Sequence, residues 1–248
     1  MFALCGAFGQ PSAAPAFEVA SVKPSQPDQP GMGMSTDKGR LLLRNATLKF
    51  SIEAAYKLQD FQLSGGPKWL DSDHYDIEGK AGAAAGFDEL IGMLKTLMAD
   101  RFQLQFHRES RMAPGYALVV AKGGSKLKDA GTEGRGGLGM GRGMVNGRSQ
   151  PVAGLAEALS RTLGRPVVDQ TELKGKYDFR MTWTPSDTEP VMQKPGTMPP
   201  EAGDARAADN IGPSVFAAIQ EQLGLKLEAR RVPVEVLVID RAERPSEN

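Results

Sequence analysis

Three carboxylates and an imidazole gather in one short stretch of the sequence, at Asp71, Asp73, His74 and Asp76. Carboxylate and imidazole groups are ligands for divalent cations, and they also serve in general acid–base catalysis. One hypothesis is therefore a metal site at Asp71, Asp73 and His74, or a catalytic set that includes His74 and Asp76. The competing interpretation is a polar turn that leads into a strand, because Asp favours turns and successive strand residues point to opposite faces.

The sequence has only two histidines, and the second is His107. Histidine is the usual general base near neutral pH, so His107 is the other catalytic candidate. It stands next to Phe106 in an alternating pattern, which is also typical of a residue at the rim of a strand. Neither a Gly-x-Ser-x-Gly nucleophile turn nor a phosphate-binding loop is present in the sequence. Whether the protein is an enzyme stays open, and a divalent metal is the only cofactor that the residues suggest.

Four aromatic residues are candidates for ligand binding, namely Trp69, Tyr75, Tyr177 and Trp183. They stand at or near two strands that correspond to each other in the two parts of the sequence. Exposed aromatic rings line ligand grooves, whereas buried rings of this kind are ordinary core residues. Both interpretations are consistent with the sequence.

Composition limits the classes of partner. Lys and Arg together number 30, as do Asp and Glu, so the formal net charge is zero. A neutral chain has no long-range attraction to nucleic acid, although local charged patches can exist within a balanced total. No apolar run reaches the roughly 18 residues that a membrane-spanning helix needs. We therefore expect no nucleic acid partner and no membrane span.

Apolar spacing predicts the secondary structure. Helices are expected at 48–56, with Asn45 or Thr47 as the cap, and at 87–102, 152–163 and 215–223. Alternation predicts strands at 17–23, 41–44, 61–63, 74–80, 103–108, 116–121, 166–168, 177–183, 225–230 and 234–240. Short turns that contain proline are expected to separate 103–108 from 116–121 and 225–230 from 234–240.

The order of these elements repeats along the chain. Tyr75-Asp76-Ile77 corresponds to Tyr177-Asp178-Phe179 in this order. We predict an α+β protein with two pseudo-repeated units, each with two helices on a mostly antiparallel sheet; one sheet shared by both halves is the alternative. The predicted segments are an N-terminal signal remnant or disordered tail (1–16), a first half (17–130), a Gly-rich linker (131–147) and a second half (148–248) with a polar excursion at 185–210.

Several strings in order resemble one protein family. They are Phe17 to Pro24, Met98 to Phe102, Pro166 to Asp169, Gly175 to Phe179, Gln222 to Glu228, Val238 to Asp240 and Pro245 to Asn248. The chain resembles an uncharacterised, soil-associated family of secreted bacterial proteins. That resemblance implies export to the periplasm or the exterior. It also implies relatives in which this region is fused to an antibiotic-sensor-type membrane metallopeptidase. The repeating helix–strand halves also look like the short N-terminal domains of secretins and TonB-dependent receptors, which are contact modules.

These observations favour an extracytoplasmic module that binds a small molecule or an envelope protein. The small apolar segment Met1–Gln10 is consistent with the end of a secretory signal. The alternative is a secreted hydrolase of small esters, amides or glycosides, with a site between the two halves. A structural component that self-associates through a sheet edge is a third hypothesis.

Overall fold

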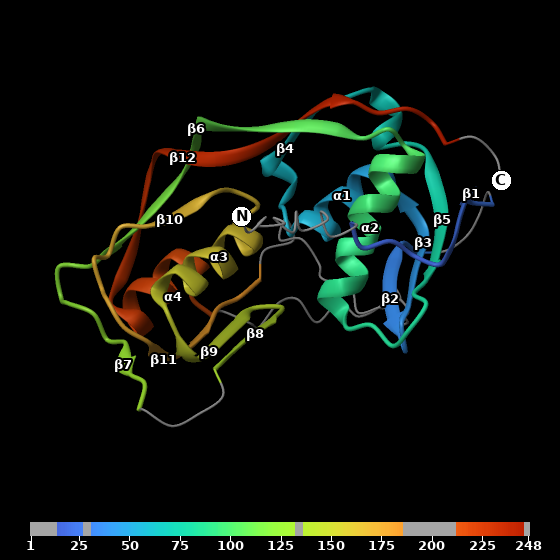
Figure 1. Ribbon diagram of the computed structural model, residues 1–248. Helices are drawn as coiled ribbons and strands as arrows, with labels where there is room; N and C mark the ends of the chain where they lie inside the picture. The colour runs from blue at the N-terminus through green and yellow to red at the C-terminus, as the bar shows by residue number, and fades with distance from the viewer. Residues whose placement is uncertain (1–13, 27–30, 132–135, 186–211, 246–248) are drawn as a thin grey trace, which may run out of the picture. The chain divides into compact units, whose positions relative to one another are not determined.

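A computed structural model describes residues 14–26, 31–131, 136–185 and 212–245 of the chain. The predicted excursion 185–210, apart from Pro185, and the N-terminal segment before residue 14 lie outside the described residues. The described α-helices are α1 (Leu48–Tyr56), α2 (Phe87–Arg101), α3 (Val152–Leu163) and α4 (Val215–Leu223) (Figure 1). The strands are β1 (Val19–Pro24), β2 (Gly33–Asp37), β3 (Arg40–Thr47), β4 (Leu63–Gly65), β5 (His74–Lys80), β6 (Gln105–Val120), β7 (Lys128–Asp129), β8 (Gly137–Gly141), β9 (Met144–Gln150), β10 (Val167–Asp169), β11 (Tyr177–Thr182) and β12 (Leu225–Arg241). Two 3-10 turns are η1 (Asp60–Gln62) and η2 (Lys68–Leu70).

The described residues thus combine four α-helices with three four-stranded sheets in which most strand pairs are antiparallel. This arrangement confirms the predicted α+β class. All four helices lie where the apolar spacing predicts them, because their ends are fixed by local chemistry. The Thr47 hydroxyl accepts a hydrogen bond from the Phe50 amide at 3.1 Å, which confirms Thr47 as the cap of α1. Helices α3 and α4 end at Gly164 and Gly224, both in the left-handed region.

The chain folds into two compact units that differ from the two halves expected from the sequence. Unit 1 comprises Met1–Leu58, Gly65–His107 and Ile239–Asn248, and unit 2 comprises Gln59–Ser64 and Arg108–Val238. Residues 59–64 and 108–130 of the expected first half therefore belong to unit 2, and the end of the expected second half, from Ile239 onward, belongs to unit 1. Such exchanges come from tertiary pairing, which a linear comparison of the halves does not reveal.

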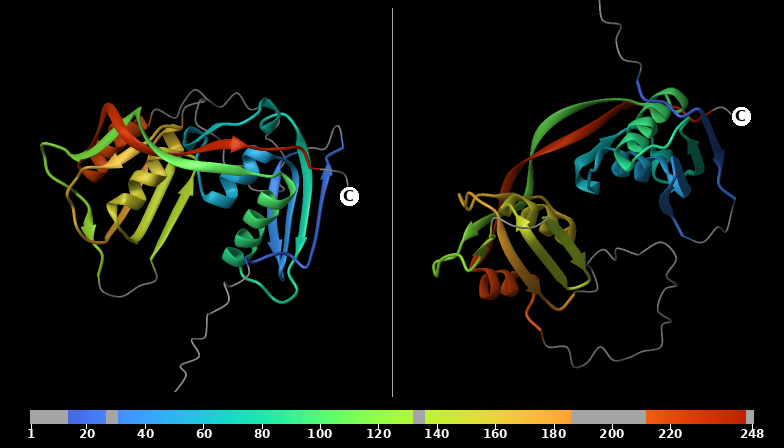
Figure 2. Two further views of the ribbon diagram at one scale, coloured as in Figure 1. Left: turned by 45° about the horizontal axis from the view of Figure 1, so that its top comes forward. Right: turned by 60° about the horizontal axis from the view of Figure 1, so that its bottom comes forward.

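Unit 1 contains a sheet with the strand order β1-β5-β3-β2. Its strands are antiparallel, and Ile77 of β5 lies opposite both Val22 of β1 and Leu43 of β3. All three side chains are buried. Helices α1 and α2 lie on the same side of this sheet, as the views in Figures 1 and 2 agree. Buried leucine and isoleucine side chains of both helices complete the core of the unit.

Unit 2 contains a second sheet, with the strand order β7-β11-β9-β8. Strand β11 alternates strictly between buried and exposed residues. Its buried side chains Tyr177, Phe179 and Met181 join one core cluster with α3 and α4. The opposite face of β11 presents Asp178 and Arg180, which are exposed. The alternation predicted at 177–183 is therefore the inside–outside pattern of a half-buried strand.

A third sheet has the order β10-β6-β12-β4, and two of its strands are much longer than the sequence suggests. The separate strands expected at 103–108 and 116–121 form one strand, β6, and those expected at 225–230 and 234–240 form β12. Proline fixes a backbone angle that extended chain also adopts, so Pro114 does not interrupt β6. A Cβ atom at Gly115 would lie 2.3 Å from the Pro166 carbonyl oxygen. Glycine at this position therefore permits a close approach to the segment that leads into β10.

The segment predicted as a glycine-rich linker contains two strands within its described residues. Residues 137–141 and 144–150 form β8 and β9, an antiparallel hairpin that can be followed in Figure 2. The physical reason is visible at Gly147, where an added Cβ atom would lie 2.3 Å from the Phe179 ring. Glycine here makes room for an aromatic side chain from the neighbouring strand, rather than providing flexibility.

Candidate ligand-binding groove

A groove of about 340 Å³ lies within unit 2. It is bounded by η1, by α3, by the segment that enters β10 and by the middle of β12. Its lining residues are Gln59, Phe61, Gln62, Ala153, Ala156, Glu157, Ser160, Pro166, Val167, Val168, Asp169, Pro233, Val234 and Glu235. The volume falls within the range of about 300–1,000 Å³ that is usual for small-molecule sites.

The groove has mainly apolar walls. On the sheet side, Val234 belongs to a small hydrophobic cluster, and Phe61 and Val168 pack against it while remaining partly accessible. On the helix side the wall is made of small residues, since Ala153 is exposed and Ala156 is buried. Small side chains on α3 leave space between the helix and the sheet, and that space is the groove. None of these residues is among the candidates drawn from the sequence, which were chosen for titratable and aromatic side chains.

Two polar residues at the groove are engaged in holding its walls together. The buried Ser160 hydroxyl donates to the Ala156 carbonyl oxygen at 2.9 Å and accepts from the Val167 amide at 2.8 Å. It thereby ties α3 to β10. The Asp169 carboxylate accepts from the Thr171 amide at 2.9 Å and from the Thr171 hydroxyl at 2.7 Å. Asp169 therefore stabilises the turn after β10.

The remaining polar residues at the rim also have structural partners. The Gln62 side chain donates to the Glu235 carbonyl oxygen at 3.3 Å and accepts from the Gln59 amide at 3.2 Å. It connects η1 to β12. Glu157 forms an ion pair with Arg161, one turn later on α3. The polar residues at the rim are thus held by hydrogen bonds and an ion pair, and the rest of the lining is mainly apolar. This arrangement suits recognition of an apolar group.

The acidic stretch from Asp71 to Asp76 lies in unit 1, and its titratable side chains contact different residues. Asp71 lies 3.4 Å from the Lys49 ammonium, and Asp73 lies 2.7 Å from the Arg244 guanidinium. The His74 Nδ1 atom lies 3.0 Å from a backbone carbonyl oxygen two residues earlier. Within the described ranges 14–26, 31–131, 136–185 and 212–245, no three His, Cys, Asp or Glu side chains meet as metal ligands would. The structure does not bring Asp71, Asp73 and His74 together as the metal-site hypothesis requires.

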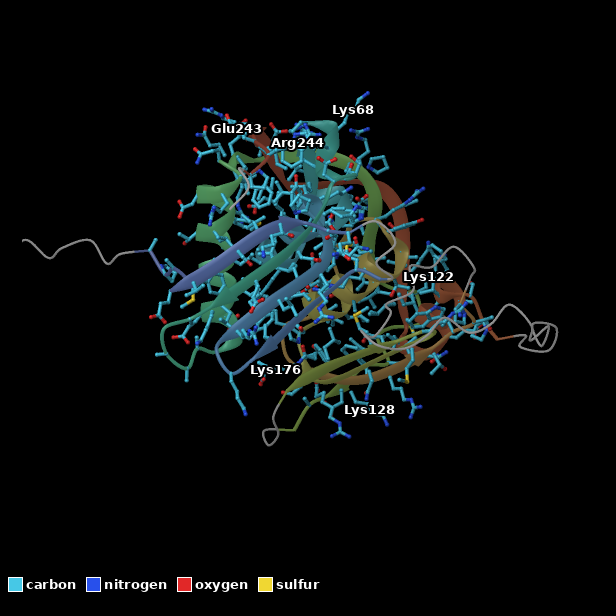
Figure 3. The ribbon with its side chains drawn as sticks, turned by 90° about the vertical axis from the view of Figure 1, so that its right-hand side faces the viewer. Lys68, Lys122, Lys128, Lys176, Glu243 and Arg244 are labelled. Atoms are coloured by element: carbon cyan, nitrogen blue, oxygen red, sulfur yellow. The ribbon has the colours of Figure 1, made fainter. Side chains whose placement is uncertain are left out.

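Asp73 and Arg244 instead fasten the C-terminal end of the chain within unit 1. The Arg244 guanidinium also lies over the ring of Trp69, 5.4 Å from its centroid, and Figure 3 marks its position. The hydrogen bond from Arg244 is the main reason that the pKa of Asp73 is below its usual value. The half-buried Trp69 ring is therefore covered on one face by a cation from the same chain, which is a structural role.

Asp76 has a role that the sequence does not reveal. Its Oδ1 atom accepts hydrogen bonds from the Asn45 amide at 2.8 Å and from the Ser25 hydroxyl at 3.0 Å. Asp178 in unit 2 accepts in the same way from the Ser149 amide at 2.7 Å. Asn45 and Ser149 both have a φ of 47°, in the left-handed region. In each unit, an aspartate that follows a buried tyrosine thus fixes an irregularity in the neighbouring strand.

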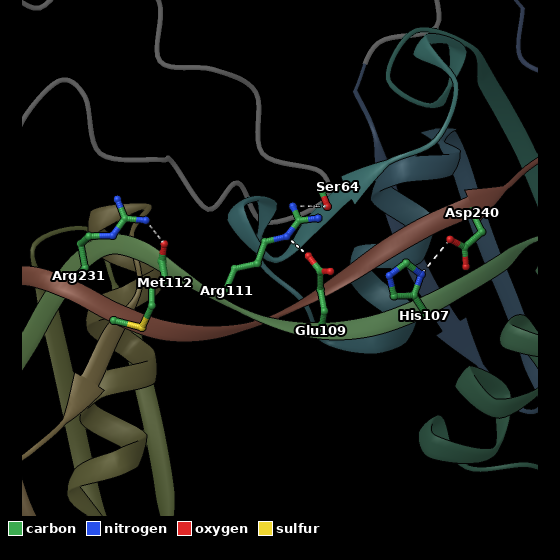
Figure 4. A network of polar contacts seen from close by, with 7 residues as sticks. All are labelled: Ser64, His107, Glu109, Arg111, Met112, Arg231 and Asp240. Carbon is green, nitrogen blue, oxygen red and sulfur yellow. Dashed lines mark hydrogen bonds and ion pairs between the residues drawn. The ribbon is translucent and has the colours of Figure 1, made fainter.

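His107 pairs with a residue that was not among the sequence candidates. Its Nδ1 atom lies 2.8 Å from the Asp240 carboxylate, and both side chains are about half exposed (Figure 4). Asp240 lies on β12, whereas His107 lies on the adjacent strand β6. A carboxylate that orients an imidazole is one part of a general-base arrangement, which also needs a nucleophile or water in reach.

Three of the four aromatic candidates are core residues. The exposed fractions are 5% for Tyr75, 8% for Tyr177 and 6% for Trp183, which leaves little surface for a ligand. The Tyr75 ring packs edge-to-face against Phe102 at 5.2 Å, and burial raises the pKa of its hydroxyl. These rings stabilise the interior of their units.

The comparisons with known proteins identify a family. In the described residues, no helix is long and apolar enough to cross a membrane. No curated protein and no solved structure matches the chain. The profile of one family, described as a protein of unknown function (DUF3738), matches residues 49–242, which is most of the sequence. The chain therefore belongs to the DUF3738 family.

Proposed function

We propose that this protein is an extracytoplasmic binding module, which holds an apolar part of its ligand in the groove of unit 2. The observation that carries the proposal is the combination of a mainly apolar lining with polar rim residues that are held by hydrogen bonds and an ion pair. An apolar surface gains free energy when a ligand removes it from water, and polar residues that already have hydrogen-bond partners limit the ordering cost of binding. A ligand with an aliphatic or aromatic group and a few hydrogen-bonding atoms fits this description.

The chemistry of the groove favours binding over hydrolysis. A hydrolase needs a nucleophile beside a base, or a base that activates water. Ser160 is the hydroxyl residue that lines the groove, and its oxygen is committed to α3 and β10. Glu157 forms an exposed ion pair with Arg161. These contacts support a site in which Ser160 holds the groove walls in place, and in which neither Ser160 nor Glu157 acts as nucleophile or base.

Hydrolysis of a small ester or amide is the second candidate, and the pair of His107 and Asp240 favours it. An imidazole oriented at 2.8 Å by a carboxylate suits a general base. The test is a panel of chromogenic esters and amides with the wild-type protein and with His107→Ala and His74→Ala. Turnover that His107→Ala abolishes and His74→Ala preserves would support this candidate. Turnover that survives His107→Ala, or no turnover at all, would reject it.

The extracytoplasmic location is proposed from the resemblance to exported proteins and from the small apolar segment Met1–Gln10. Fractionation of cells that carry the natural gene tests it. We expect the protein with periplasmic or culture-medium markers, and recovery with a cytoplasmic marker would contradict the proposal.

We also propose that the two units descend from a duplicated α/β unit. The sheet orders β1-β5-β3-β2 and β7-β11-β9-β8 correspond strand by strand, and each hairpin leads into a helix. Asp76 and Asp178 each follow the buried tyrosine of the central strand and each accept an amide from a residue with a φ of 47°. Shared irregularities of this kind support a common origin more strongly than shared regular structure, because they are not required by an α/β fold.

The groove is tested by filling it. Ala153 is exposed on the α3 wall, so Ala153→Trp places a large ring in the groove without disturbing the core. Ala229→Trp, at an exposed position of β12 that does not line the groove, is the matched control. A thermal-shift screen of amphiphilic small molecules and peptides should give hits that are lost in Ala153→Trp and kept in Ala229→Trp. Hits that persist in Ala153→Trp would place binding elsewhere and reject the groove.

A further inference from the structure

Two further hollows lie on unit 2, away from the groove, and they share a lysine. One, of about 440 Å³, lies at the C-terminal end of α4 and is lined by Lys122, Lys126 and Lys226 together with small and amide residues. The other, of about 380 Å³, lies on β9 and β11 and is lined by Lys126, Lys128, Arg148 and Arg180 among others. Lys126 lines both hollows, and we call their combined lining the cationic surface.

The fold sets the positions of these cations. On β11 the exposed Arg180 stands between the buried Phe179 and Met181, so its side chain emerges from the face opposite the core. On β9 the exposed Arg148 follows the buried Gly147 in the same manner. Lys128 of β7 lies opposite Asp178 in the antiparallel pairing. Lys122 and Lys128 can be followed in Figure 3.

Negative charge is scarce on this surface. Among the residues that the structure describes, Asp178 is the only carboxylate that lines either hollow, and it already accepts the Ser149 amide. Lys126 donates to the Glu221 carbonyl oxygen, and Lys226 lies 3.6 Å from a Glu228 carboxylate.

The other four cations, Lys122, Lys128, Arg148 and Arg180, form no ion pair within the described part of the chain. Four cations without an ion-pair partner among the described residues thus line the two hollows of a protein whose formal net charge is zero. A polyanion that displaces counterions from such a surface gains free energy in proportion to the cations it contacts.

The shape and composition of the surface narrow the class of anion. Two hollows in series suit an extended polymer better than a single compact anion. Phe179 is the one aromatic residue in either lining, and with an exposed fraction of 6% it offers no face on which a base could stack. Arginine binds carboxylate and sulfate groups through paired hydrogen bonds, and lysine adds point charges. We propose that the cationic surface binds a linear anionic polysaccharide that carries carboxylate or sulfate groups.

The test uses the full chain and defined polymers. Fluorescently labelled heparin and polygalacturonate are titrated by anisotropy, with dextran as the neutral polymer and a single-stranded oligonucleotide as the competing polyanion. We expect both anionic polysaccharides to bind and dextran not to bind. Affinity should fall with salt, as it does when counterions are released.

The decisive variant is Lys128→Glu/Arg180→Glu, and the matched control is Lys23→Glu/Lys80→Glu on exposed positions of unit 1. Both doubles change the net charge equally, and circular dichroism melts establish that each is folded. The first should weaken polysaccharide binding by about tenfold or more and flatten its salt dependence, whereas the control should stay within about twofold. Equal weakening in the control, no binding by the wild type, or tighter binding of the oligonucleotide than of either polysaccharide would overturn the proposal. Since Ala153→Trp leaves this surface intact, failure here and failure of the groove are separate results.

Discussion

Replacement of Asp178 by alanine should lower the stability of unit 2, because it removes one hydrogen bond from a backbone amide to the carboxylate. The carboxylate accepts the Ser149 amide at 2.7 Å, where β9 and β11 shift register. A hydrogen bond to a charged group contributes about 1.5–3 kcal/mol, and the exposed position of Asp178 favours the lower end of that range. We therefore expect Asp178→Ala to reduce the free energy of unfolding by about 1.5–2 kcal/mol in urea titrations.

The same substitution at Asp76 is the internal comparison. Asp76 accepts both the Asn45 amide and the Ser25 hydroxyl, so Asp76→Ala should cost at least as much as Asp178→Ala. Hydrogen exchange locates each effect, because the Ser149 amide should lose protection in Asp178→Ala and the Asn45 amide in Asp76→Ala. Losses below about 0.5 kcal/mol in both variants, or unchanged exchange at these amides, would refute the assigned role.

A rescue variant separates the hydrogen bond from backbone strain. Ser149 has a φ of 47°, a conformation that costs a non-glycine residue about 1 kcal/mol. Ser149→Gly keeps the amide donor and removes this cost, so it should recover part of the stability that Asp178→Ala loses. If Ser149→Gly destabilises the Asp178→Ala protein further, the strain argument is incorrect.

Two more predictions concern packing and pH. Gly147→Ala should destabilise unit 2 by about 1–3 kcal/mol, because the new Cβ atom would meet the Phe179 ring at 2.3 Å, whereas Gly137→Ala, which meets nothing within 4 Å, should be nearly neutral in the same urea titration. Equal effects of the two alanines would contradict the packing argument. Since the Arg244 hydrogen bond lowers the pKa of Asp73 from 3.8, its stabilisation should be fully present above pH 3.8 and disappear as the pH falls through the lowered value. Melting temperatures of the wild type and Asp73→Asn should therefore converge only in that acidic window, and a constant difference down to pH 2 would argue against the assignment.

The sequence predicts those elements whose signals are local. Helix α1 follows from the spacing of Leu48, Ile52 and Ala55 and from the Thr47 cap, and each of these acts within one or two turns. The buried and exposed positions of β5 and β11 follow from strict alternation. Local chemistry is sufficient in these cases because tertiary packing reinforces the same pattern.

The errors arise where a distant partner decides the conformation. Pro114 and Gly115 read locally as a turn, yet the approach of Pro166 makes glycine necessary inside a continuous strand. The glycine-rich run around Gly147 has the composition of a flexible linker. In the structure, however, Gly147 lacks a side chain because the ring of Phe179 occupies the space where its Cβ atom would lie. In both cases the relevant neighbour lies more than 30 residues away, so no window along the sequence contains it.

The groove was not predictable for a related reason. Its walls come from η1, α3, β10 and β12, which are dispersed from Gln59 to Glu235. Its most important residues are small and apolar, such as Ala153 and Ala156, and carry no chemical signature. The cationic surface was likewise hidden by the zero net charge, because a balanced total conceals how the charges are distributed.

The most direct test of the groove is a map of ligand-induced chemical shift changes in ¹⁵N-labelled protein, made with the strongest thermal-shift hit. We expect the largest changes on Phe61, Ala153, Glu157 and Val168, and we expect Ala153→Trp to eliminate them while Ala229→Trp does not. If the changes cluster around His107 and Asp240, or are distributed over the whole protein, the groove is not the binding site and the proposed function is wrong.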